Sequence, residues 1–209
     1  MILYHGTSMS ALTCISDEGV LRPGVRCNWP DAPSRSDMIY LTNCYAPHFA
    51  IAAASEYDRP VVLEIEVSRD TLEQKGFPDE DFLYQARGPA QRDITHDDCR
   101  ELVFSNKNLA SLSLERLGTI ALRGTIPHTS IRRVAVITRP VPWALMFDPT
   151  ISIMNHTILG KFYENSLRLL FGDIDTMPRP SGLKPEITRD AFAPEVWTYR
   201  PEVFEEMTR

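Results

Sequence analysis

The sequence predicts an α+β fold, because it contains several short strand-like segments, few helix-like segments and no regular alternation between the two. Its 209 residues are 43% hydrophobic, which suffices for one compact domain with a buried core. Past residue 140 the pattern changes to a long amphipathic segment and then a proline-rich stretch. We therefore expect a main domain over 1–140, and a C-terminal helical extension with a proline-rich tail over 141–209 packed on it.

The first part of the chain predicts a strand followed by a capped helix. Residues 1–4 are apolar and form the expected strand. Ser8 is a favourable helix N-cap and Gly19 a favourable stop, so we expect a helix between them. The next expected elements are a surface loop at 21–37, a strand at 38–42 and an alanine-rich helix at 46–55.

Residues 61–67 read VVLEIEV and alternate strictly, which predicts a half-buried strand with Glu64 and Glu66 on its solvated face. Residues 70–97 are polar with little periodicity, which predicts a long functional loop whose acidic residues 79–81 lie at the surface. The remaining expected elements are a strand at 100–104, a helix at 108–118, antiparallel paired strands at 119–127 and 131–137, and an amphipathic helix at 156–172.

Composition limits the classes of function. No run of about 18 apolar residues is present, and the first residues lack a basic start and apolar core, so we expect a cytoplasmic protein with no membrane span. The four cysteines and five histidines are dispersed without metal-ligand spacing, so we expect neither disulfides nor a bound metal. The net charge of −6 disfavours broad electrostatic binding of nucleic acid.

Two short motifs carry a resemblance. His5-Gly6-Thr7 follows the first strand, and Ile39-Tyr40-Leu41-Thr42 precedes the alanine-rich helix. With the intervening helix and loop, this order resembles the ADP-ribosyltransferase-like superfamily of the histidine-tyrosine-glutamate type. That group includes poly- and mono-ADP-ribosyltransferases, DNA-modifying toxins and RNA 2′-phosphotransferases. The resemblance covers about residues 1–138 and implies a split-sheet sandwich with short flanking helices.

The resemblance implies roles for the first motif. His5 would hydrogen-bond the adenosine ribose hydroxyls of NAD. Gly6, having no side chain, would let its backbone N–H and C=O approach the nicotinamide carboxamide. Thr7 or Ser8 could add a hydroxyl contact.

The second motif would form the opposite wall of the same cleft. The ring of Tyr40 would stack on the nicotinamide, because a flat π-face supports a planar cationic heterocycle. Thr42 shares the face of Tyr40 in an extended strand, so it is a further candidate for lining the cleft.

A carboxylate is required as the third element. Breaking the nicotinamide–ribose bond passes through an oxocarbenium-like state, which a nearby carboxylate stabilises. Glu101 is the preferred candidate and Glu115 the alternative catalytic acid. Another alignment places the family's glutamate near Thr119, which cannot serve as a carboxylate.

Arginines between the two motifs are candidates for the NAD pyrophosphate, because guanidinium groups match phosphate oxygens. Arg22, Arg26 and Arg35 lie in this loop, and the sequence does not decide among them.

Together these features imply an NAD-dependent mono-ADP-ribosyltransferase, with NAD as co-substrate and no metal. It would cleave the nicotinamide–ribose bond and transfer ADP-ribose to a macromolecular acceptor, whose identity the sequence leaves open together with the oligomeric state. The alternatives are an NAD-dependent RNA 2′-phosphotransferase and an inactive module that binds NAD or ADP-ribose.

Overall fold

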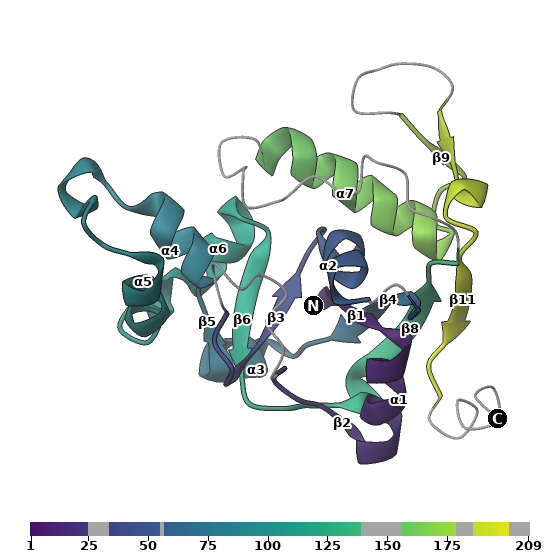
Figure 1. The fold of residues 1–209 in the computed structure, drawn as a ribbon, viewed down its shortest axis with the longest axis horizontal. Coiled ribbons are helices and arrows are strands. Elements are labelled where there is room, and N and C mark those ends of the chain that lie inside the picture. Colours follow the sequence, from purple (N-terminus) through teal and green to yellow (C-terminus); the bar gives the residue numbers. More distant parts are fainter. Residues whose placement is uncertain (25–33, 55–56, 139–155, 179–185, 201–209) are drawn as a thin grey trace.

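The computed structural model describes residues 1–24, 34–54, 57–138, 156–178 and 186–200 (Figure 1). Within these ranges seven strands form one antiparallel sheet in the order β11-β8-β4-β1-β3-β6-β5. The expected α+β class is confirmed at this level. The strands are β1 (Ile2–Ser8), β3 (Met38–Thr42), β4 (Pro60–Glu66), β5 (Gly76–Phe77), β6 (Thr119–Arg123), β8 (Ile131–Val136) and β11 (Glu195–Thr198).

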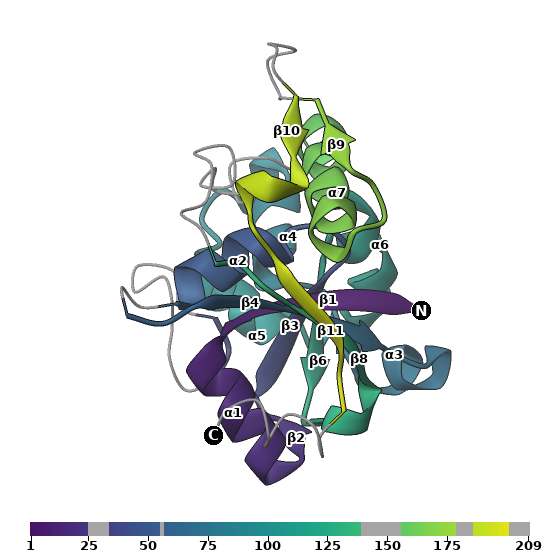
Figure 2. The same cartoon turned by 90° about the vertical axis from the view of Figure 1, so that its right-hand side faces the viewer.

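The sheet consists of two strand groups that meet at a narrow junction. β1 pairs with β4 along all seven of its residues, and β3 pairs with β6 along all five. Between β1 and β3 the register records one pair among the described residues, Tyr4 with Thr42. Figure 2 shows β3 and β6 running steeply across the direction of β1 and β4. The two groups therefore diverge on one side of the Tyr4–Thr42 pair.

Helices cover both faces of the sheet. On one face α2 and α7 pack against Val62 and Ala135, and on the other α1 packs against Leu63. The α4–α5 unit covers the outer strands β3, β6 and β5 (Figure 1). The helices are α1 (Met9–Glu18), α2 (Ala46–Ala53), α3 (Arg69–Lys75), α4 (Glu80–Ala86), α5 (His96–Leu102), α6 (Ala110–Arg116) and α7 (His156–Phe171).

The predicted caps of the first helix are confirmed. The Ser8 hydroxyl accepts a hydrogen bond from the Ala11 N–H, and Gly19 ends α1 with a φ of 73°. A left-handed residue at this position favours glycine, so both ends of α1 are encoded locally. The helices expected at 46–55, 108–118 and 156–172 correspond to α2, α6 and α7.

The expected loop at 70–97 is wrong, because α3, β5 and α4 lie within it. The expected strand at 100–104 is also wrong. Thr95 and Asp98 form a reciprocal capping box, so the chain enters helix α5 there and Glu101 is helical. Each helix in this region has seven residues, which is too short for a hydrophobic period to be seen in the sequence.

The pairing expected between 119–127 and 131–137 is wrong as well. β6 pairs with β3 and β5, whereas β8 pairs with β4 and β11. Gly124, with a φ of 92°, ends β6 and the chain then forms the short strand β7 (Ile126–Pro127). β7 pairs with β2 (Val20–Leu21), so a tight hairpin between β6 and β8 does not form.

The chain beyond residue 141 adds α7 and the edge strand β11 to these layers (Figure 2). Between them, β9 (Thr176–Met177) pairs with β10 (Ile187–Thr188). The expected domain boundary at 140–141 lies outside the described residues. No helix in the described ranges combines the length and the apolar character needed to cross a bilayer.

Strand β4 is buried on both faces, so the expectation that Glu64 is solvated is wrong. Glu64 is 6% exposed, and the Arg133 Nε donates to its carboxylate at 2.9 Å. The guanidinium of Arg133 in turn lies over the ring of Phe171 in α7. Glu66, one pleat further along, is half exposed and pairs with Arg132. The alternating pattern therefore predicted the strand correctly. The face that carries Glu64 and Glu66 is buried at its Glu64 end, because α7 packs there.

Gly6 determines how closely α2 approaches β1. A Cβ at Gly6 would lie 2.3 Å from both the Ala46 carbonyl oxygen and the Ala50 backbone nitrogen. Side-chain rotation cannot relieve a clash with helix backbone. The bare Cα of Gly6 is thus required for the packing of α2 on the centre of the sheet.

We expect Gly6→Ala to lower the free energy of unfolding by about 2 kcal/mol or more, because α2 must shift away from the sheet. Thermal or denaturant unfolding of the full chain measures this. Gly88→Ala is the matched control, since no atom lies within 4 Å of a Cβ at Gly88 and its φ of −77° suits alanine. Equal stabilities of the two variants would show that α2 does not rest on Gly6.

Candidate functional site

His5 and Tyr40 meet at the junction between the two strand groups. The Nδ1 of His5 lies 2.9 Å from the backbone carbonyl oxygen of Tyr40. A carbonyl oxygen only accepts, so Nδ1 carries the proton and Nε2 is left as an acceptor. Burial lowers the pKa of His5, and the bond to Tyr40 offsets this only in part. The ring is therefore neutral at physiological pH.

The ladder pattern places the Gly6 backbone groups in the same junction. The Met1 and Val67 backbones exchange both hydrogen bonds, so odd-numbered residues of β1 bond to β4. Even-numbered residues, including Tyr4 and Gly6, consequently turn their N–H and C=O toward β3. Tyr4 pairs with Thr42 of β3, and this pairing does not extend to Gly6.

The His5 side chain therefore replaces one backbone hydrogen bond between β1 and β3. Continuing the Tyr4–Thr42 register would set Gly6 opposite Tyr40. Instead the His5 ring donates to the Tyr40 carbonyl. The β1–β3 pairing thus ends at Tyr4–Thr42, and the Nε2 acceptor of His5 and the backbone of Gly6 lie at this end of the ladder.

The phenol of Tyr40 is held from two sides. Its hydroxyl donates to the carboxylate of Glu80, with both carboxylate oxygens 2.7 Å from the phenol oxygen. The backbone N–H of Arg35 donates to the same phenol oxygen at 3.0 Å. Burial and the adjacent Glu80 raise the pKa of Tyr40 far above its usual value, so the phenol stays protonated.

Glu80 is a site residue that the sequence analysis missed. The expectation that residues 79–81 lie at the surface is wrong, because Asp79 and Glu80 are 7% and 2% exposed. Asp79 caps α4 by accepting from the Asp81 N–H, and Glu80 opens the helix. The sequence Pro-Asp-Glu-Asp-Phe-Leu contains the signal, since an Asp cap with acids in the first turn predicts a helix start.

Arg35 connects Tyr40 to the α5 region. Its guanidinium pairs with Asp37 at 2.8 Å and with Glu101 at 2.9 Å, and lies over the ring of Phe104. Among the described arginines of the loop, Arg22 is exposed and pairs with Glu18 four residues before it. Arg26 lies outside the described residues. The Arg35 guanidinium is thus engaged within the protein, whereas the Arg22 side chain is open to solvent.

The three candidate positions for a carboxylate lie in different surroundings. The Glu101 side chain is 79% exposed and pairs with the guanidinium of Arg35. The backbone N–H of Arg35 in turn donates to the Tyr40 phenol, so Glu101 is linked to Tyr40 through Arg35. Glu115, on α6, is 73% exposed and lines a separate pocket. Thr119 begins β6, is buried and faces Thr42 in the register.

The two threonines predicted to line the cleft are buried. The hydroxyl of Thr42 donates to the Gly118 carbonyl at 2.6 Å and accepts from the Tyr45 N–H at 2.9 Å, so it fixes the turn into α2. Thr7 is 7% exposed on β1. Both side chains are therefore closed off from solvent.

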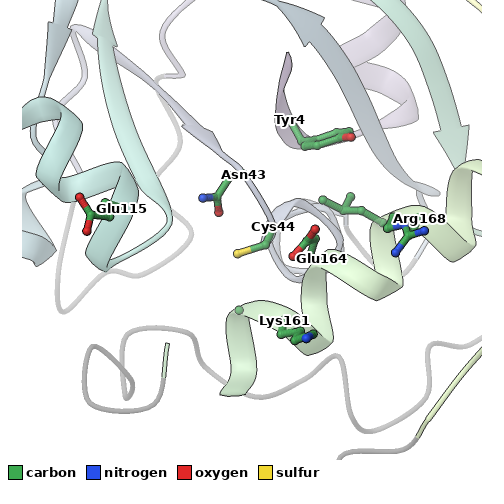
Figure 3. A pocket seen from close by; sticks show the side chains of 9 residues that line it. Tyr4, Asn43, Cys44, Glu115, Lys161, Glu164 and Arg168 are labelled. Atoms are coloured by element: carbon green, nitrogen blue, oxygen red, sulfur yellow. The ribbon is translucent and has the colours of Figure 1, made fainter. Parts of the chain in front are cut away.

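A separate pocket of about 660 Å³ lies beside Tyr4 and the residues that follow β3, Asn43 and Cys44 (Figure 3). It opens between β1, the turn after β3, α6 and α7. Its lining carries both signs of charge, and Glu115 is the one predicted site residue in it. The lining residues are Tyr4, Asn43, Cys44, Glu115, Gly160, Lys161, Glu164, Leu167 and Arg168.

Within the described ranges, no group of three or more histidine, cysteine, aspartate or glutamate side chains is arranged to hold a metal ion. No family model, curated protein or solved structure matches this chain.

The buried acids make a testable electrostatic contribution. Burial, with the charges of Asp81 and Glu80 adding to it, raises the pKa of Asp79 well above its ordinary value. The folded chain therefore keeps the Asp79 proton at a pH where the unfolded chain has lost it. The resulting stabilisation is complete at low pH and is lost as the pH rises from the ordinary carboxyl pKa through the raised one.

We expect Asp79→Asn to flatten this pH dependence and to gain stability relative to wild type as the pH rises, because asparagine keeps the cap oxygen without the buried charge. Asp98→Asn is the control with the opposite sign. Hydrogen bonds from the Thr95 hydroxyl and N–H lower the pKa of Asp98, so its contribution is present at neutral pH and lost as the pH falls. Unfolding free energies from about pH 2 to 8 measure both, because the Asp98 contribution is lost only below the ordinary carboxyl pKa. If the stability of the two variants relative to wild type changed with pH in the same direction, the opposite pKa shifts assigned to Asp79 and Asp98 would be wrong.

Proposed function

We propose that the chain is an NAD-dependent mono-ADP-ribosyltransferase that cleaves the nicotinamide–ribose bond and transfers ADP-ribose to a macromolecular acceptor. The observation that carries the proposal is the hydrogen bond from the His5 ring to the Tyr40 backbone carbonyl at the end of the β1–β3 pairing. It brings the His5 imidazole, a neutral acceptor, to the strand that carries Tyr40, at the end of the β1–β3 pairing beside Gly6, and so links residues of the two motifs of the resemblance.

Each of these groups suits one part of NAD. The Nε2 of His5 accepts a hydrogen bond, which matches a ribose hydroxyl as donor. The N–H and C=O of Gly6 on the β3-facing edge match the C=O and NH₂ of a carboxamide. The ring of Tyr40, which is partly exposed, offers its face to the cationic nicotinamide.

The approach of α2 refines the proposed role of Gly6. Because the helix backbone fills the space where a Cβ would lie, the missing side chain serves helix packing. The ligand contact is assigned to the peptide groups of Gly6 alone.

Glu101 remains the proposed carboxylate for the oxocarbenium-like state, because a ligand can reach it and Arg35 holds it next to the Tyr40 neighbourhood. Glu115 is separated from this network, since it lines the pocket beside Tyr4 (Figure 3). Arg22 is the proposed pyrophosphate ligand, because its exposed pair with Glu18 is weak and easily exchanged.

Incubation of the full chain with labelled NAD and a cell extract tests the proposal. We expect nicotinamide release and a labelled acceptor, and a loss of about tenfold or more in kcat/KM for His5→Ala and Tyr40→Ala, because each removes a contact to NAD in a desolvated site. Tyr57→Ala, which removes a tyrosine that is 93% exposed, is the control and should retain full turnover. Absence of both nicotinamide and labelled product rules the transfer out. NAD binding without turnover would instead support a silent NAD-binding module.

The choice between the two exposed glutamates is a separate prediction. We expect Glu101→Ala to lower kcat by about tenfold or more and Glu115→Ala to leave it unchanged, since removing transition-state charge stabilisation affects the chemical step. Single-turnover measurements at saturating NAD separate kcat from binding. A loss of kcat in Glu115→Ala with an unchanged kcat in Glu101→Ala would instead assign the catalytic carboxylate to the pocket that Glu115 lines.

A further inference from the structure

Glu80 is a buried acid in direct contact with the candidate aromatic ring. It is 2% exposed, and both of its carboxylate oxygens lie 2.7 Å from the phenol oxygen of Tyr40. Resting on the proposed function, we propose that Glu80 is a positioning residue that fixes and polarises Tyr40 for binding a planar cationic ring. Being closed off from solvent, it acts through Tyr40 and not by touching the substrate.

The geometry leaves the phenol little freedom. A tyrosine hydroxyl has one proton to donate, and here that proton faces Glu80. The Arg35 N–H occupies an acceptor position of the same oxygen. The ring also packs against a small apolar cluster that includes Met38 and Phe104. Two directed hydrogen bonds and this packing set the plane of the ring before any ligand arrives.

The ionised carboxylate adds an electrostatic effect. A hydrogen bond from a phenol to an anion is shorter and stronger than one to a neutral acceptor, and it draws electron density from the O–H bond into the ring. A more electron-rich face attracts a cation more strongly. Glu80 thereby favours a positively charged heterocycle over a neutral one at Tyr40.

Titration of Glu80 sets when this effect operates. Burial raises its pKa, and the Tyr40 hydrogen bond offsets the rise in part. The charged and titratable groups facing it are Tyr40 from β3, Asp79 at the N-cap of α4, Asp81 from α4, and His96 and Cys99 from α5. His96 pairs with Asp81 at 2.8 Å, which partly neutralises the acid next to Glu80. Polarisation of Tyr40 therefore strengthens as the pH rises through the elevated pKa of Glu80.

Glu80→Gln is the main variant, because it keeps an acceptor oxygen for Tyr40 and removes the charge. Tyr40→Phe removes the hydroxyl and keeps the ring, and the double variant closes a thermodynamic cycle. Asp81→Asn is the matched control, since Asp81 is the neighbouring acid on α4 and its partner is His96.

The first readout needs no NAD. The ¹³Cζ NMR signal of Tyr40 in the full chain, assigned by its loss in Tyr40→Phe, is followed from pH 4 to 9. We expect the signal to titrate above the ordinary glutamate range in wild type and in Asp81→Asn. In Glu80→Gln we expect this titration to shrink to the smaller contribution of the nearby Asp79 charge. A signal that does not respond to pH in wild type overturns the proposal even if Glu80→Gln does not fold.

The second readout is the steady-state kinetics of NAD turnover. We expect Glu80→Gln to raise KM about fivefold, as for exchanging a charge-assisted hydrogen bond for a neutral one, with a smaller change in kcat. In the Tyr40→Phe background the same change should add nothing, and additive effects would overturn the proposal. A coupled Tyr40 titration without NAD turnover supports the Glu80–Tyr40 pair and contradicts ADP-ribosyl transfer. NAD turnover together with a Tyr40 signal that does not titrate with Glu80 supports ADP-ribosyl transfer and contradicts the proposed role of Glu80.

Discussion

The hydrogen bond from the His5 ring to the Tyr40 carbonyl joins the two strand groups at the point where their backbone pairing stops. A buried carbonyl left without a partner would cost free energy, so the ladder can end at Tyr4–Thr42 only if another donor replaces the next N–H. One imidazole meets this need and leaves its second nitrogen, with the backbone of Gly6, at the end of the paired ladder. Removing the ring would leave the Tyr40 carbonyl without this donor.

The same region contains groups that reduce stability at neutral pH. Asp79 and Glu80 are buried side by side, and burial raises the pKa of each. Strongly shifted acids next to an opening in a sheet are common at functional sites, where they serve chemistry at the expense of stability. Elsewhere the buried acid Glu64 is matched by the guanidinium of Arg133. The contrast suggests that the acids around Tyr40 serve binding and that the Glu64–Arg133 pair serves the fold.

The sequence was sufficient where the signal is local. Ser8 and Gly19 define α1, and the alternation of residues 61–67 defines β4. The sequence also placed His5 and Tyr40 on two strands of one site, and the structure brings them into contact. Their roles toward NAD remain proposals. The motifs do not predict the backbone register that turns the peptide groups of Gly6 toward β3. That register depends on which strands become neighbours in the sheet.

The remainder depends on tertiary contacts. The burial of Glu80 arises because α4 packs onto β3 and β6, and nothing in an acidic tripeptide indicates which of its residues will face a tyrosine 40 positions earlier. The α3–α5 region was misassigned because its helices are too short for periodicity. The pairing of β6 and β8 was misassigned because sequence neighbours separated by a short turn usually pair, whereas here β7 diverts the chain to β2.

The amide NMR signal of Gly6 during a titration with NAD tests whether NAD binds at the junction between β1 and β3. With ¹⁵N-labelled glycine the chain gives signals from ten residues, and Gly6 is assigned by substitution. We expect NAD to shift the Gly6 signal strongly and to leave that of Gly160, in the pocket beside Tyr4, unchanged. A shift of Gly160 with an unperturbed Gly6 would place the ligand in that pocket and contradict the assignment of the junction between β1 and β3 as the site.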